Sequence, residues 1–110
     1  QLEGVSKNVD ANTRGITKIK IDVNGAVVKS RAWASCSPSD CDWGWVSAQP
    51  LTASVSDAPE SGNSILSVWN SSIAKRSAVM TRTDNMLTVQ VTTVYKDNRS
   101  DRLNTYVFTK

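Results

Sequence analysis

Residues 87–95 read L-T-V-Q-V-T-T-V-Y, in which the side chains at odd positions alternate with Thr88, Gln90 and Thr92. Successive side chains of a β-strand point to opposite faces, so this alternation predicts a half-buried strand. Residues 18–23 read K-I-K-I-D-V and show the same period of two. The dipeptide Asn24-Gly25 follows them, and this pair is the strongest short signal for a β-hairpin.

The rest of the chain continues this pattern, and no stretch shows the apolar stripe of a helix. The expected strands cover residues 2–9, 18–23, 26–36, 43–55, 65–70, 75–83, 87–95 and 103–109. Short turns separate most of them, while residues 57–64 form a longer polar loop. An up-and-down arrangement of about eight strands removes its exposed edges by closing. We therefore expect one all-β domain over residues 1–110, a small antiparallel barrel, with a β-sandwich as the alternative.

Composition favours a binding protein over a catalyst. The 110 residues contain no histidine, which excludes Ser-His-Asp and Cys-His catalysis and the usual zinc ligands. Asp40 and Asp42 share one short loop, so they lie too near each other to flank a glycosidic bond. We expect no enzyme activity, no cofactor and no bound metal.

The basic residues are confined to the two flanks of the chain. The net charge is +3, yet none of the 13 basic residues falls between Ala32 and Ala74. The basic flanks either attract an anionic partner weakly or only keep the surface solvated. All four tryptophans lie between Ala32 and Ala74, the segment without basic residues. Nucleic-acid binding, which uses aromatic rings among basic residues, is therefore not expected. The absence of an apolar run of about 18 residues predicts no membrane insertion.

Cys36 and Cys41 are the only cysteines, separated by Ser-Pro-Ser-Asp. A metal site needs two further ligands, and a redox motif prefers the spacing C-x-x-C, so a disulfide fits best. A disulfide indicates an oxidising compartment, and a first residue other than Met fits a chain whose signal peptide was removed. Possible N-glycosylation sites are Asn70 and Asn98. We expect a secreted or extracellular protein.

Two motifs carry a resemblance. Residues 8–17, N-V-D-A-N-T-R-G-I-T, and residues 33–44, W-A-S-C-S-P-S-D-C-D-W-G, resemble the paired motifs of a family of small secreted all-β domains. The resemblance implies an all-β fold and a secreted protein, and it implies no settled activity. Ser37 stands where that family has histidine. Residues 2–8 are more loosely similar to the start of avidin-like and lipocalin-like barrels, although the tryptophan usual there is replaced by Val5-Ser6.

The candidate ligand-binding residues surround the two cysteines. Trp43 and Trp45 are two positions apart, so on a regular strand they share one face. Stacked indole rings beside carboxylates suit a sugar, whose apolar face packs on the ring while its hydroxyls bond to Asp. The alternative is that the tryptophans fill the barrel interior. The predicted site consists of Trp33, Asp40, Asp42, Trp43, Trp45 and Arg14.

We therefore expect a carbohydrate-binding protein, a lectin of glycans or glycoproteins, acting as a homo-oligomer because cross-linking needs several sites. Two alternatives stay open. A barrel that encloses a small apolar ligand needs a hollow interior lined by Ile19, Ile21, Val89, Val91 and tryptophans. A protease-inhibitor module would insert the loop 36–41. Arg14 is expected either to contact a ligand or to pair with Asp40 or Asp42.

Overall fold

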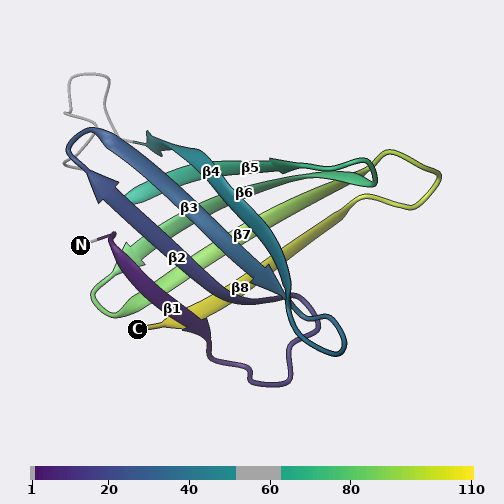
Figure 1. Ribbon diagram of the computed structural model, residues 1–110, viewed down its shortest axis with the longest axis horizontal. Coiled ribbons are helices and arrows are strands. Elements are labelled where there is room, and N and C mark those ends of the chain that lie inside the picture. Colours follow the sequence, from purple (N-terminus) through teal and green to yellow (C-terminus); the bar gives the residue numbers. More distant parts are fainter. Residues whose placement is uncertain (1, 52–62) are drawn as a thin grey trace.

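The chain folds into a closed antiparallel barrel in the computed structural model, which describes residues 2–51 and 63–110. The strands are β1 (Gly4–Asn8), β2 (Ile16–Asn24), β3 (Val27–Ala34), β4 (Cys41–Leu51), β5 (Ser64–Asn70), β6 (Ala74–Thr83), β7 (Met86–Tyr95) and β8 (Arg102–Thr109). Each strand pairs with the next along the chain, and β8 pairs back with β1 (Figure 1). The prediction of an eight-stranded up-and-down barrel is confirmed.

The period of two determines which side chains enter the barrel. In β7 the residues Leu87, Val89, Val91 and Thr93 are buried, whereas Thr88, Gln90 and Thr92 are exposed. The same alternation buries Ile19 and Ile21 of β2 and Val28 and Ala32 of β3. Burying such apolar side chains is the main favourable contribution to folding.

The β2–β3 hairpin forms one residue later than the sequence indicates. Asn24 pairs with Val27, so the two-residue turn is Gly25-Ala26. Gly25 has a φ of +63°, a left-handed conformation that glycine adopts without steric cost. The expected strand 43–55 starts earlier, at Cys41, and its predicted residues 52–55 lie outside the described part, as do residues 57–62 of the predicted loop.

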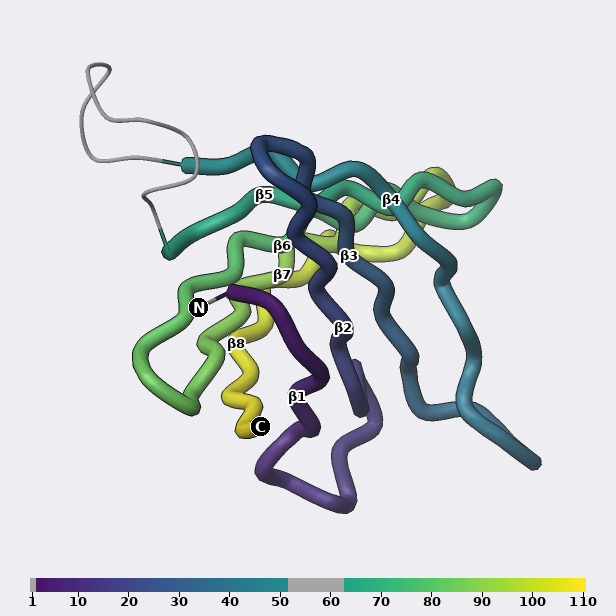
Figure 2. Tube along the Cα trace, turned by 60° about the vertical axis from the view of Figure 1, so that its left-hand side comes forward, coloured from purple at the N-terminus to yellow at the C-terminus, as the bar shows by residue number. Residues whose placement is uncertain are grey.

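The connections divide between two ends of the barrel. The short turns β2–β3 and β6–β7 lie at one end, with the chain termini near them. The connections β1–β2, β3–β4, β5–β6 and β7–β8 lie at the opposite end, which we call the open end (Figures 1 and 2). Figure 2 shows that the β1–β2 and β3–β4 connections at this end lie apart from the β5–β6 and β7–β8 turns. Residues 2–51 and 63–110 contain no helix with the length and apolar composition that crossing a membrane requires.

Candidate functional site at the open end of the barrel

A β-bulge in β4 separates the tryptophans that were expected to act together. Ala32 of β3 pairs with Gly44, and Trp33 pairs with Asp42, so Trp43 is an extra residue on β4. A bulge interrupts the alternation of side chains, and Gly44 has the positive φ of +82°. The expectation that Trp43 and Trp45 share one face is therefore wrong.

Trp43 belongs to the inner wall. Its ring packs against the hydrophobic core and lies edge-on to Trp69, with ring centroids 5.5 Å apart and planes at 63°. Trp69 is only 5% exposed, and its indole N–H donates a hydrogen bond of 3.0 Å to the carbonyl of Gly44. The interpretation that tryptophans fill the interior thus holds for these two residues.

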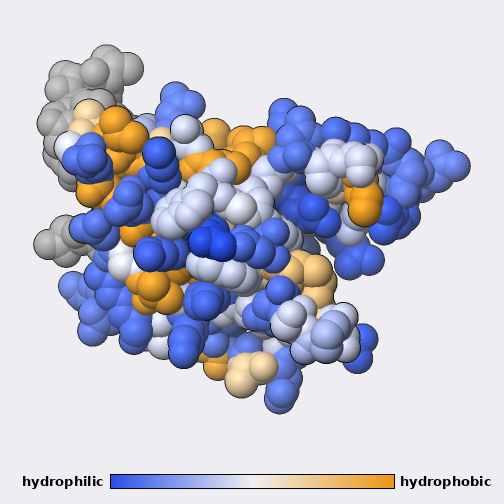
Figure 3. All heavy atoms as spheres, in the orientation of Figure 1, coloured by the Kyte–Doolittle hydropathy of each residue, from blue (hydrophilic) through white to orange (hydrophobic). Residues whose placement is uncertain are grey.

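Trp33 and Trp45 belong instead to the outer surface. Together with Lys18, Lys20 and Arg31 they form a group on β2, β3 and β4 that we call the outer cluster. Arg31 lies 4.8 Å from the ring centroid of Trp33, and Lys18 lies 4.3 Å from the same centroid. Trp45 remains 42% exposed. Hydrophilic, near-neutral and hydrophobic side chains are mixed over this side of the molecule (Figure 3).

Asp42 is held by the outer cluster. Its carboxylate forms a salt bridge with Arg31 and accepts a 2.8 Å hydrogen bond from the backbone N–H of Gly44. The hydrogen bond from Arg31, followed by that from Gly44, lowers the pKa of Asp42 to about 2. The carboxylate therefore fixes the bulge and the neighbouring strand at the same time.

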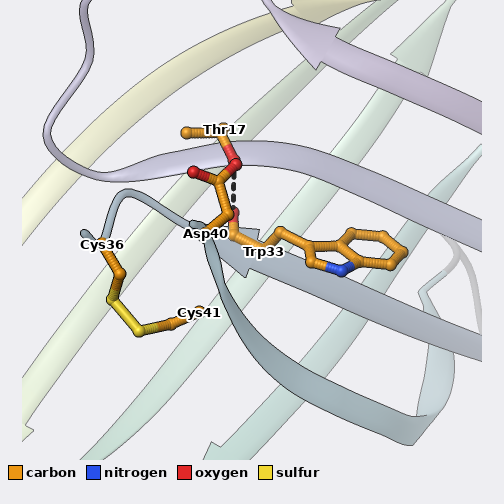
Figure 4. Close-up of a disulfide and its surroundings, with 5 residues drawn as sticks. All are labelled: Thr17, Trp33, Cys36, Asp40 and Cys41. Carbon is orange, nitrogen blue, oxygen red and sulfur yellow. Dashed lines mark hydrogen bonds between the residues drawn. A yellow bond between two sulfur atoms is a disulfide. The ribbon is translucent and has the colours of Figure 1, made fainter. Parts of the chain in front are cut away.

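Asp40 has a comparable local partner. Its Oδ2 lies 2.6 Å from the hydroxyl of Thr17, which also lies 3.1 Å from the carbonyl of Trp33 (Figure 4). The predicted disulfide Cys36–Cys41 is present beside this contact, and the indole of Trp33 extends away from it. The interaction expected between Arg14 and Asp40 or Asp42 is wrong, because these carboxylates contact Thr17 and Arg31 instead.

The open end contains a cavity of about 420 Å³, which we call the mouth cavity. Its charged and aromatic lining residues are Arg14, Arg76, Arg102, Trp43, Tyr95 and Tyr106. The disulfide forms part of the wall, together with polar groups such as Thr93 and Asn104. Of the predicted site residues, the cavity therefore brings together only Arg14 and Trp43.

The interior below this cavity is filled. Of the residues expected to line a hollow interior, Ile19, Ile21 and Val89 are buried in one packed core and do not line the mouth cavity, whereas Val91 and Trp43 do line it. The expected apolar lining is therefore wrong for Ile19, Ile21 and Val89 and correct for Val91 and Trp43. Within the described residues, the mouth cavity provides room for a ligand at the open end.

The sequence analysis did not predict Arg76, Arg102, Tyr95 and Tyr106. For three of them, the alternation of side chains in β6 and β8 could have indicated that they face inward. Arg76 lies on the inward-facing row of β6, between the buried Ala74 and Ala78. In β8 the same alternation places Arg102 and Tyr106 on the row of the buried Phe108. Charged side chains are uncommon on a row that points into a barrel, so Arg76 and Arg102 could have marked a site.

Comparison with models of known families, with curated proteins and with solved structures finds no match for this chain. What defines the protein is therefore its architecture, an eight-stranded antiparallel barrel with a cavity at one end. The described ranges 2–51 and 63–110 contain no group of three or more acidic or cysteine side chains placed to hold a metal ion.

Proposed function

We propose that the protein is a non-catalytic binding protein that holds a small ligand in the mouth cavity. The observation that carries this proposal is the 420 Å³ cavity with aromatic walls at one end of a closed barrel. Ligand pockets typically have volumes of about 300–1,000 Å³ and combine apolar walls with a few polar groups. The loose likeness to avidin-like and lipocalin-like barrels is part of this proposal.

A binding role suits the chemistry near the cavity better than catalysis. Asp40 and Asp42 already accept hydrogen bonds from structural partners. The sequence offers no histidine as a general base. The pairing of the surrounding strands orders the site in advance, which lowers the conformational entropy that the protein loses when a ligand binds.

Carbohydrate recognition is the second candidate, and the outer cluster favours it. Trp45 keeps 42% of its surface exposed, and Trp33 lies nearby on the adjacent strand. Exposed indole rings are suitable surfaces for the apolar face of a sugar. This candidate keeps the expectation of a homo-oligomer that binds glycans or glycoproteins. Both candidates are proposed for a secreted protein, which the disulfide supports.

A protease-inhibitor role has less support. The loop 36–41 would have to insert into a protease, yet its Asp40 is hydrogen-bonded to Thr17. Cys36 and Cys41 also line the mouth cavity. Both ends of the loop are thus in contact with the barrel.

Two matched variants distinguish the leading candidates. Trp43→Ala should abolish binding of the neutral fluorescent probe N-phenyl-1-naphthylamine, because it removes a wall of the mouth cavity. Trp45→Ala should leave this binding unchanged but should remove any signal on a glycan array. Circular dichroism checks that both variants are folded. Probe binding that survives Trp43→Ala would contradict the cavity proposal.

A further inference from the structure

We propose that the mouth cavity selects an anionic molecule: a small carboxylate, sulfate or sulfonate that also carries a flat apolar portion. This inference rests on the proposed function and adds the chemical class of the ligand. The group that carries it is the set of three arginines, Arg14, Arg76 and Arg102, around one cavity.

The arginines reach the cavity from separate parts of the chain. Arg14 comes from the β1–β2 connection, Arg76 from β6 and Arg102 from the start of β8. Arg14 and Arg102 are exposed at the rim, and Arg76 is half-buried. Within the described residues, no salt bridge involves any of them, and no Asp or Glu lines the cavity. Three like charges around one cavity repel each other, and a bound anion offsets this repulsion.

The nearby carboxylates have other partners. Asp42 pairs with Arg31, and Asp97 pairs with Arg99. Asp101 accepts a hydrogen bond of 3.2 Å from the backbone N–H of Tyr95.

Loop contacts occupy the remaining acids of the connections at the open end. Asp10 accepts a hydrogen bond of 3.0 Å from the backbone N–H of Asn12, and Asp40 contacts Thr17. These acids have local partners and none of them lines the cavity, so the three arginine side chains there remain available to a ligand.

Aromatic side chains complete the recognition surface. The guanidinium of Arg76 lies 4.8 Å from the ring centroid of Trp43, so each side chain restrains the other. Tyr95 and Tyr106 add two further rings to the lining. Burial raises the pKa of Tyr106, so its phenol stays protonated at neutral pH and can donate a hydrogen bond to an anion. Rings beside guanidinium groups fit a flat molecule with an acidic substituent.

Two dyes that differ by one anionic group test the inference. The probes are 8-anilinonaphthalene-1-sulfonate and N-phenyl-1-naphthylamine, which has the same rings without the sulfonate. We expect the sulfonate to bind at least about 10-fold more tightly, as one or two charge-assisted hydrogen bonds provide. Fluorescence titration at low and physiological salt measures both dissociation constants.

Variants of the cavity arginines test whether these residues bind the sulfonate. Arg102→Gln and Arg14→Gln should each weaken sulfonate binding by roughly 10-fold and leave binding of the neutral dye unchanged. Lys29→Gln is the matched control, because Lys29 is exposed on β3 near the β2–β3 turn, at the end opposite to the mouth cavity, and is outside the cavity lining. This control should bind both dyes like the wild type.

Each outcome separates the two proposals. Equal affinity for both dyes, with both lost in Trp43→Ala, would overturn the anion inference and keep the cavity proposal. An equal loss of sulfonate binding in Lys29→Gln would also overturn the inference, since net charge alone would explain it. If neither dye binds, both proposals fail.

Discussion

Gly15 lets Tyr106 reach the wall of the mouth cavity. A Cβ atom placed on Gly15 would collide with the phenol ring of Tyr106. Both residues line the cavity, so the missing side chain at position 15 gives the ring its place. The N-T-R-G turn therefore has a steric role in addition to presenting Arg14.

We expect Gly15→Ala to lower the free energy of unfolding by about 1–3 kcal/mol, because overpacking displaces the ring or the backbone. Urea denaturation measures the loss. In a Tyr106→Ala background the added cost of Gly15→Ala should fall to about 0.5 kcal/mol or less, since the clash is gone. An undiminished cost in that background would show that the backbone at Gly15, and not the ring, excludes alanine.

Arg82 is a different kind of arginine, enclosed near the end opposite to the mouth cavity. It is 2% exposed, and its Nη2 donates to the carbonyl of Leu2 at 3.3 Å and the hydroxyl of Ser6 at 3.0 Å. Its Nε and Nη1 have no hydrogen-bond partner among the described residues. Burial of this guanidinium lowers the pKa of Arg82, which reflects the cost of enclosing an incompletely satisfied charge.

Arg82→Met should therefore leave the free energy of unfolding unchanged or raise it by about 1 kcal/mol, because Met fills similar space without a charge. Arg82→Ala should lower it by about 2–4 kcal/mol through the cavity it creates. Thermal and urea unfolding of both variants measure the difference. A loss of several kcal/mol in Arg82→Met would mean that the buried charge is well stabilised.

The bulge in β4 is the local feature that positions the aromatic residues. It directs Trp43 toward the core and leaves Trp45 on the outer cluster. Asp42 stabilises it from both strands, through Arg31 of β3 and the backbone N–H of Gly44. The pKa of about 2 makes this stabilisation dependent on pH.

The pKa of Asp42 is lower in the folded chain than its usual unfolded value of about 3.9. Its contribution to stability is therefore complete above that value and is lost as the pH falls toward about 2. We expect Asp42→Asn to be less stable than the wild type at pH 7, and the difference to shrink between pH 4 and pH 2. Urea midpoints measured across this range test the prediction, with Arg31→Gln as the second variant. A difference independent of pH would contradict it.

Closure of the barrel holds the strands together, whereas the disulfide constrains only one short loop. All eight strands are paired around the ring, whereas Cys36 and Cys41 are only five positions apart in the sequence. The closing contact between β8 and β1 is short, with Lys7 opposite Thr109 and Asn8 opposite Phe108. The disulfide therefore shapes the rim of the mouth cavity more than it holds the strands together.

We expect the double variant Cys36→Ser/Cys41→Ser to fold and to lose at most about 2 kcal/mol, the chain-entropy value for so small a loop. Its far-ultraviolet circular dichroism should match that of the wild type. Binding of 8-anilinonaphthalene-1-sulfonate should weaken, because both cysteines line the cavity and the disulfide fixes their positions. A variant that fails to fold would show that the disulfide supports the barrel itself.

Local pattern was enough to predict the number of strands, their up-and-down order and the buried row of β7, because alternation depends only on neighbouring residues. The faces of Trp43 and Trp45 were not predictable in this way, because the bulge depends on how β4 pairs with β3. The assembly of Arg14, Arg76 and Arg102 depends on contacts between distant segments. Residues so far apart in the chain meet only because the sheet closes on itself and brings four connections to one end.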